Sequence, residues 1–203
     1  LIATKNGLGA RFNESRVSVM GRTAHGVRGI SLRDGDEVAG ACIVYGDEEW
    51  NRENKLLVIT EGGFGKRCEF DNFSAHNRGV KGVMCHGISE RTGKLAGIAA
   101  VGESDDIMMI TNDGTIIRTP VSGIPFYGRS AGGVIVMRLS EGSSLVNFAR
   151  LENDEELEAE GMASDEGTAA IAPAESDEKV DPTEDEIDLG GGAGNKPDED
   201  DDI

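Results

Sequence analysis

The stretch KLLVITEGGFGKRCEF, residues 55–70, contains an apolar run followed by three glycines and a Lys-Arg pair. This combination is typical of phosphate-binding loops, so we tested two nucleotide motifs against it. A P-loop reads G-x-x-x-x-G-K-[ST], but counting back from Gly65 places Thr60 at the first glycine, and Arg67 stands where the hydroxyl residue belongs. A dinucleotide fingerprint reads G-x-G-x-x-G and fails at Cys68. The sequence therefore excludes both nucleotide motifs.

The same stretch occurs three times, and this repetition decides the fold. LIATKNGLGARF begins at residue 1, and MMITNDGTIIRT covers residues 108–119. In every copy a Thr is followed three residues later by a Gly, and that Gly is followed four residues later by an Arg. The aligned residues are Thr4, Thr60 and Thr111, then Gly7, Gly63 and Gly114, then Arg11, Arg67 and Arg118. A period near fifty residues predicts a propeller, a solenoid or an array built from one supersecondary unit.

A second pattern follows each copy and reads HGVRGISL (25–32), RGVKGVMC (78–85) and AGGVIVMR (131–138). We expect close backbone approach or a bulge at its shared glycines, Gly29, Gly82 and Gly133. The apolar runs are strand-length, rich in Val and Ile, and separated by turn sequences such as TNDGT; they cover 56–60, 80–85, 95–101 and 107–111. No apolar stripe at helical spacing occurs before residue 150. The pattern predicts an all-β fold of about three four-stranded blades over residues 1–150.

The charge distribution divides the chain near residue 150. Residues 1–150 contain 18 Lys and Arg and 17 Asp and Glu, whereas residues 151–203 contain 2 Lys and 21 acids. The second segment has no aromatic residue and few branched aliphatic residues, so it cannot bury enough apolar surface to offset chain entropy. We expect a disordered acidic tail over 151–203.

No residue set in the chain has the pattern of a catalytic or metal site. The three cysteines, Cys42, Cys68 and Cys85, lie in or beside strand-like runs without a C-x-x-C motif, which predicts buried reduced thiols. Tyr45 and Tyr127 also lie in β-rich repeats. We therefore expect no catalytic residue, no metal ion and no cofactor in this chain. Trp50 is expected to pack locally or to cap a blade.

The repeated strand, the Arg that follows it and the RGVKGV element together resemble the C-terminal domain of the A subunit of DNA gyrase, a type IIA topoisomerase. The resemblance covers residues 1–150 and implies a β-pinwheel, a propeller-like disc that wraps DNA around its rim. The family's Gln-Arg-Arg-Gly-Gly-Arg-Gly box has only degenerate counterparts here, at 24–29, 76–82 and 130–133. Its absence leaves open the related A subunit of topoisomerase IV. We expect the box upstream of Leu1, in a longer protein of which this chain is a fragment.

Cations recur at equivalent positions of the repeats, which lie on one surface of a stacked or radial array. Such a track would contact phosphates without reading bases. The predicted DNA-backbone contacts are Arg11, Arg22, Arg28, Lys66, Arg67, Arg78, Lys81, Arg118 and Arg129. The alternatives are solvated charges balanced by acids on the same face, a propeller that binds an acidic protein, and a blade-built enzyme with its site in the central channel.

The resemblance also implies properties of the parent enzyme. It implies double-stranded DNA as substrate, strand passage with ATP-dependent negative supercoiling, and ATP and Mg²⁺ as cofactors of the parent. It further implies a partner, the gyrase B subunit, in an A2B2 heterotetramer. The implied location is the bacterial cytoplasm, in association with the nucleoid and without a membrane partner.

Overall fold

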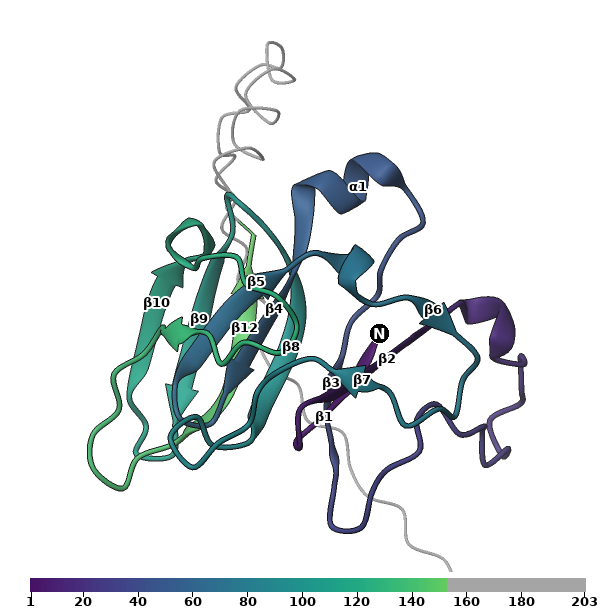
Figure 1. Ribbon diagram of the computed structural model, residues 1–203, viewed down its shortest axis with the longest axis horizontal. Helices are drawn as coiled ribbons and strands as arrows, with labels where there is room; N and C mark the ends of the chain where they lie inside the picture. The colour runs from purple at the N-terminus through teal and green to yellow at the C-terminus, as the bar shows by residue number, and fades with distance from the viewer. Residues whose placement is uncertain (153–203) are drawn as a thin grey trace, which may run out of the picture. The chain divides into compact units, whose positions relative to one another are not determined.

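The computed structural model describes residues 1–152, all of which lie within one compact unit (Figure 1). The predicted acidic tail lies outside the described residues except for its first two positions. The first repeat contains β1 (Ile2–Thr4), β2 (Leu8–Phe12), the 3-10 helix η1 (Glu14–Arg16) and β3 (Val38–Ala41). The second contains α1 (Glu48–Glu53), β4 (Asn54–Thr60), β5 (Phe64–Cys68), η2 (Phe70–Asn72), β6 (Ala75–His76), β7 (Val83–Met84) and β8 (Leu95–Gly102). The third contains β9 (Asp106–Thr111), β10 (Ile116–Pro120), η3 (Val121–Gly123), β11 (Val134–Ile135) and β12 (Leu145–Leu151).

Each repeat begins with a tight hairpin, and the recurring Thr and Gly build its turn. The Gly amide donates to the Thr carbonyl, at 3.0 Å for Gly7, 2.9 Å for Gly63 and 3.0 Å for Gly114. The Thr hydroxyl accepts from the amide four residues later, at 3.3, 3.2 and 3.1 Å in the three repeats. All three glycines have φ between 74° and 83°, which only glycine adopts without strain. These are three-residue hairpin loops with a left-handed glycine.

A third strand pairs antiparallel with the first strand of each hairpin. These pairs are β3 with β1, β8 with β4, and β12 with β9. The register shifts at the third strand in every repeat, next to Thr4, next to Thr60 and opposite Thr111. The repeated Thr therefore marks both the hairpin turn and a recurring irregularity of the ladder.

The remaining strand of a blade comes from the next repeat. Strand β7 of the second repeat pairs with β2 of the first, and β11 of the third pairs with β5 of the second. β6 adds to β2 in parallel, and a parallel bridge between Arg67 and Phe126 is the equivalent contact one blade later. The sheets have five, four and three strands in the described residues, which agrees with the expectation of about four strands per blade. Exchange of strands links each repeat to its neighbour.

Two of the shared glycines are required by this exchange. Gly82 has φ +79°, and a Cβ atom there would lie 2.6 Å from the Gly9 carbonyl oxygen. Gly133 has φ +68°, and its Cβ would overlap the Gly65 carbonyl. Gly29 has no positive φ, and its nearest neighbour is the Ile2 side chain. The expectation of close approach is confirmed at Gly82 and Gly133 for backbone and at Gly29 for a side chain.

Two apolar clusters hold the sheets together, one on each face of β4. Leu56 and Val58 pack with Ala3 of the first sheet, while Leu57 and Ile59 pack with Met109 of the third sheet and its neighbours. The two faces follow from the two-residue period of a strand. Figure 1 shows the β10–β9–β12 sheet beside the β11–β5–β4–β8 sheet. β4 is therefore the central strand of the described part.

One α-helix departs from the prediction. Asp47 caps α1 by accepting from the Glu49 amide at 2.7 Å, and Trp50 stacks on Phe70 with ring centroids 5.5 Å apart. The cap explains a short helix without an apolar stripe, and the stacking confirms local packing of Trp50. No helix in residues 1–152 has the length and apolar character that crossing a bilayer requires.

Candidate nucleic-acid interface

The recurring Arg is a clamp between repeats. Arg67 is 4% exposed; its Nε donates to the Ile124 carbonyl at 2.5 Å, and its Nη2 donates to the Ser122 carbonyl at 3.4 Å. Its guanidinium also pairs with Glu103 and lies 4.2 Å from the centroid of the Phe126 ring. Arg67 of the second repeat thus binds the 3-10 turn of the third. The structure does not support the predicted phosphate contact of Arg67, because its side chain is buried and its Nε, Nη1 and Nη2 all donate to protein acceptors.

Arg11 makes the equivalent contact one blade earlier. Its Nη1 donates to the Phe70 carbonyl at 3.0 Å and to the Phe73 carbonyl at 3.4 Å, at the 3-10 turn of the second repeat. Arg118 has no following turn to bind in residues 1–152; its Nε donates to Asp106 Oδ2 of its own sheet at 2.5 Å, and its side chain is 57% exposed. In the first two repeats the recurring Arg therefore contributes to repeat-to-repeat packing, and phosphate contact by Arg11 and by Arg118 stays a prediction.

Lys66 is also placed in the interior. Its residue exposure is 0%, and its Nζ donates to the carbonyls of Gly128, Arg129 and Ala131 at 2.8, 2.6 and 2.8 Å. Burial lowers the pKa of Lys66. Direct contact between Lys66 and a phosphate is not supported, because all three acceptors are protein carbonyls.

The other predicted cations lie in long loops that contain no acid. In the first two repeats, the segments that follow the 3-10 helix, 17–32 and 73–89, contain no Asp or Glu, and in the third repeat the segment that begins with the 3-10 helix, 121–140, contains none either. Each of these three acid-free loops carries two cations: Arg22 and Arg28, Arg78 and Lys81, Arg129 and Arg138. The rest of residues 1–150 holds 12 cations and 17 acids. Positive charge is thus concentrated in the acid-free loops.

The fold brings neighbouring acid-free loops into contact. The Arg78 guanidinium donates to the carbonyls of Arg16 and Arg28 at 2.8 and 3.3 Å, which ties the second loop to the first. Ile30 and Val80 form a parallel bridge beside these bonds. The Gly87 amide donates to the Ala131 carbonyl at 3.5 Å, which joins the second loop to the third. The three loops therefore form one connected surface.

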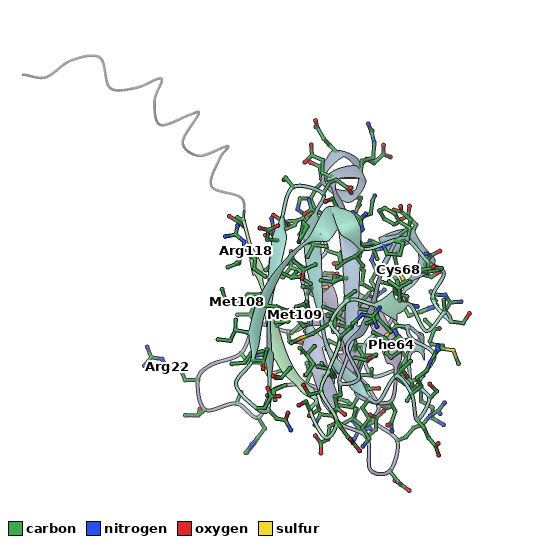
Figure 2. The ribbon with its side chains drawn as sticks, turned by 90° about the vertical axis from the view of Figure 1, so that its left-hand side faces the viewer. Arg22, Phe64, Cys68, Met108, Met109 and Arg118 are labelled. Carbon is green, nitrogen blue, oxygen red and sulfur yellow. The ribbon has the colours of Figure 1, made fainter. Side chains whose placement is uncertain are left out.

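The loop cations are not neutralised by the described residues. Arg22, Arg28 and Lys81 are exposed, Arg78 and Arg129 are half-buried, and none of the six loop cations forms an ion pair with a carboxylate in residues 1–152. Figure 2 shows Arg22 extending from the end of its loop. Sequence reasoning missed Arg138, which is exposed and could have been found from the absence of acids around it. Unpaired exposed cations are available to an anionic partner.

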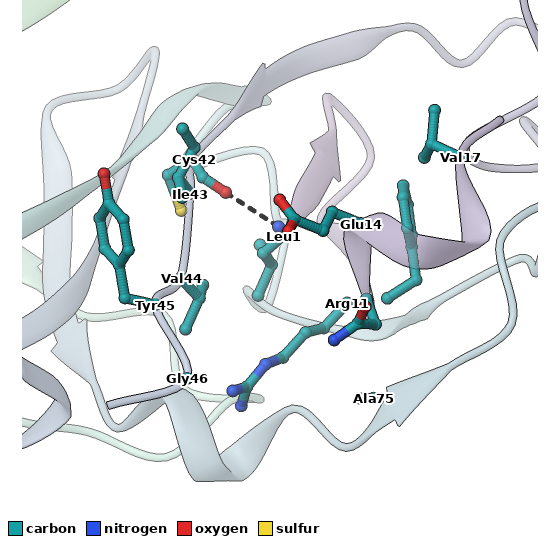
Figure 3. A pocket seen from close by; sticks show the side chains of 12 residues that line it. Leu1, Arg11, Glu14, Val17, Cys42, Ile43, Val44, Tyr45, Gly46 and Ala75 are labelled. Carbon is teal, nitrogen blue, oxygen red and sulfur yellow. Dashed lines mark hydrogen bonds between the residues drawn. The ribbon is translucent and has the colours of Figure 1, made fainter. Parts of the chain in front are cut away.

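One cavity of about 440 Å³ lies beside the β1–β2 hairpin. Figure 3 shows the Leu1 backbone nitrogen donating to the Cys42 carbonyl at 2.9 Å at this cavity. Arg11 and Glu14 supply the only charged side chains among the residues that line it. The lining offers no pair of carboxylates or nucleophile and base that would indicate acid–base chemistry.

The buried titratable groups are structural. Burial raises the pKa of Cys85 to about 12 and also raises the pKa of Cys42 and Cys68. Burial, and then the nearby charge of Lys66, lower the pKa of His86 to about 4. The described residues contain no cluster of three His, Cys, Asp or Glu side chains that could hold a metal ion. These groups are neutral at pH 7; Cys68, Cys85 and His86 are buried, whereas Cys42 is half-buried.

Comparison with known proteins agrees with the repeat architecture. The family described as DNA gyrase C-terminal domain, beta-propeller, matches residues 1–43, 54–101 and 105–152. The DNA gyrase A subunit of Aminobacterium colombiense is 43% identical over 155 residues, which are 76% of this chain and 18% of that protein. The corresponding protein of Salmonella typhimurium is 41% identical over 166 residues, with 80% and 18% covered. The chain spans about a fifth of the length of these curated relatives.

Solved structures show the same architecture. The C-terminal domain of DNA topoisomerase IV aligns with a TM-score of 0.70 at 24% identity, over 80% of this chain and 49% of that one. The DNA gyrase A C-terminal domain aligns with a TM-score of 0.64 at 27% identity, over 74% and 50%. The expected all-β, propeller-like fold is confirmed. On these matches and on its exchanged-strand repeats, the chain belongs to the DNA gyrase C-terminal domain family.

Proposed function

We propose that this chain is the DNA-wrapping part of the A subunit of a DNA gyrase and binds duplex DNA through its three acid-free loops. The observation that carries the proposal is the connected surface of loops with two cations each and no carboxylate. Family membership supports the same assignment. The proposed contacts are Arg22, Arg28, Arg78, Lys81, Arg129 and Arg138.

The contacts are to phosphates and carry little sequence information. The only α-helix of the described residues has six residues and includes Glu48, Glu49 and Glu53, so it is unsuited to enter a major groove. Cations spaced along successive repeats would instead follow the backbone of a bent duplex. We therefore expect similar affinity for unrelated sequences and a steep dependence on salt.

The salt dependence of binding tests the acid-free loops directly. Each phosphate contact contributes a slope of about −0.9 in log K against log salt, which corresponds to about eightfold in affinity at 0.1 M salt. Lys81→Gln should remove one such contact and lower affinity for every duplex alike. Lys94→Gln is the matched control, because Lys94 is exposed, lies outside the acid-free loops and forms no ion pair in residues 1–152. Equal effects of the two variants would contradict the assignment.

The activity of the whole enzyme belongs to the same proposal. The full-length protein, with a gyrase B subunit, ATP and Mg²⁺, should introduce negative supercoils into relaxed plasmid DNA. Decatenation and relaxation without negative supercoiling would indicate the A subunit of topoisomerase IV instead. The supercoiling result does not depend on which residues contact DNA, so the supercoiling assay and the salt titration of Lys81→Gln can fail separately.

A further inference from the structure

Lys66 is a buried cation without a carboxylate partner in residues 1–152. Its Nζ has three acceptors within 2.8 Å, the carbonyls of Gly128, Arg129 and Ala131. A neutral amine has only two N–H donors, so three acceptors at these distances require the ammonium form. Other groups near Lys66 are Cys68, Cys85 and His86, all of them neutral at pH 7. The three carbonyl dipoles are therefore what stabilises this charge.

These bonds fix the backbone of the third acid-free loop. Three carbonyls within four consecutive residues converge on a single atom of the second repeat. The amides of Gly128, Arg129, Ser130 and Gly132 donate to no protein acceptor in residues 1–152. Because a trans peptide unit points its carbonyl and its amide in opposite directions, these amides face away from Lys66. Arg129 adds a side-chain cation to the same segment.

No other repeat has this arrangement. The residue before the clamp Arg is Ala10 in the first repeat and Ile117 in the third, so only the second repeat supplies a buried ammonium. Its charge lies directly beneath the segment 128–131, where no acid occurs between residues 121 and 140. A fixed positive charge under a loop with free amides favours an anion above it.

We propose that Lys66 is a positioning residue for phosphate binding: its buried ammonium holds residues 128–132 so that their outward-facing amides and the Arg129 side chain contact DNA phosphates. Lys66 does not touch the DNA. The inference rests on the proposed DNA-binding function and adds to it a site at the junction of the second and third repeats.

A double-mutant cycle in the full-length protein tests this, with a mixed-sequence duplex as probe. Arg129→Gln should reduce the salt slope by about 0.9 and affinity about eightfold at 0.1 M salt. Lys66→Met, which keeps the stem but removes the charge, should cause at least the same loss. The double variant should bind no more weakly than Lys66→Met alone, because the site is already lost. In a second double variant, Lys66→Met with Lys81→Gln, the two losses of affinity should multiply, because Lys81 lies in another loop.

Three outcomes of these measurements would overturn the positioning role of Lys66. The positioning role is overturned if Lys66→Met binds like the wild type, or if its effect multiplies with that of Arg129→Gln. It is also overturned if Lys66→Met abolishes the separate effect of Lys81→Gln, which would indicate a general loss of structure. A wild-type protein whose affinity shows no salt dependence would contradict the proposed function itself.

Hydrogen exchange gives a second test that does not require Lys66→Met to fold. In the wild-type protein, the amides of Gly128, Arg129, Ser130 and Gly132 should gain protection when the duplex binds. The hairpin turn at 112–114, which lies outside the acid-free loops, should not. Binding of the duplex without added protection at 128–132 would overturn the phosphate site.

Discussion

Replacing Arg67 by Met should destabilise the fold without removing a DNA contact. The substitution keeps much of the stem but removes the hydrogen bond to the Ile124 carbonyl, whose residue is only 1% exposed. A charge-assisted hydrogen bond contributes about 1.5–3 kcal/mol, and the cation–π contact with Phe126 adds about 1 kcal/mol. The ion pair with Glu103 adds little, because that carboxylate is 67% exposed. The expected loss of unfolding free energy is about 2.5–4 kcal/mol, or roughly 10 °C in Tm.

The assay combines unfolding and DNA binding on the same variant. Urea and thermal unfolding, followed by circular dichroism, report stability, and affinity between 50 and 200 mM salt reports phosphate contacts, roughly one for each 0.9 of slope. Arg22→Met is the control, because Arg22 is exposed and should change stability by no more than about 0.5 kcal/mol. The clamp interpretation would be refuted if Arg67→Met were as stable as the wild type while its salt slope fell by about 0.9.

Two further perturbations test the packing between repeats. Gly133→Ala should lower the free energy of unfolding by about 2 kcal/mol or more, because φ is +68° and the added Cβ would overlap the Gly65 carbonyl. The control is Gly123→Ala, which has open space around the added Cβ and no positive φ, and it should be nearly neutral in the same urea titration. The pKa of His86 is lowered to about 4 in the folded protein, by burial and then by Lys66. As the pH falls, His86 is therefore protonated in the unfolded chain before it is protonated in the folded protein. The free energy of unfolding should be greatest above pH 6.5 and should fall by up to about 3 kcal/mol as the pH drops towards 4. Unfolding between pH 8 and pH 4.5 should show this loss, and His86→Gln should reduce it.

Much of the fold could be predicted because its signals are local. Thr60 and Gly63 form a turn with atoms no more than four residues away, so their spacing alone predicts a hairpin in each repeat. The low acid content of the loops is likewise visible in the sequence, and it marks the same surface that the structure connects. Trp50 packs edge-on against Tyr45, five residues earlier, which agrees with the expected local packing.

The partner of each repeated cation was decided only by the tertiary structure. Arg67 binds a carbonyl 57 residues further along the chain and Arg11 one 59 residues further, and each belongs to the next repeat. A periodic Arg that faces solvent and one that clamps the following repeat have the same spacing, so periodicity cannot distinguish them. The sequence likewise does not distinguish the buried Lys66 from the cations of the acid-free loops. A lysine side chain can bury its charge only where carbonyl groups accept its hydrogen bonds, and the third repeat supplies these carbonyls to Lys66.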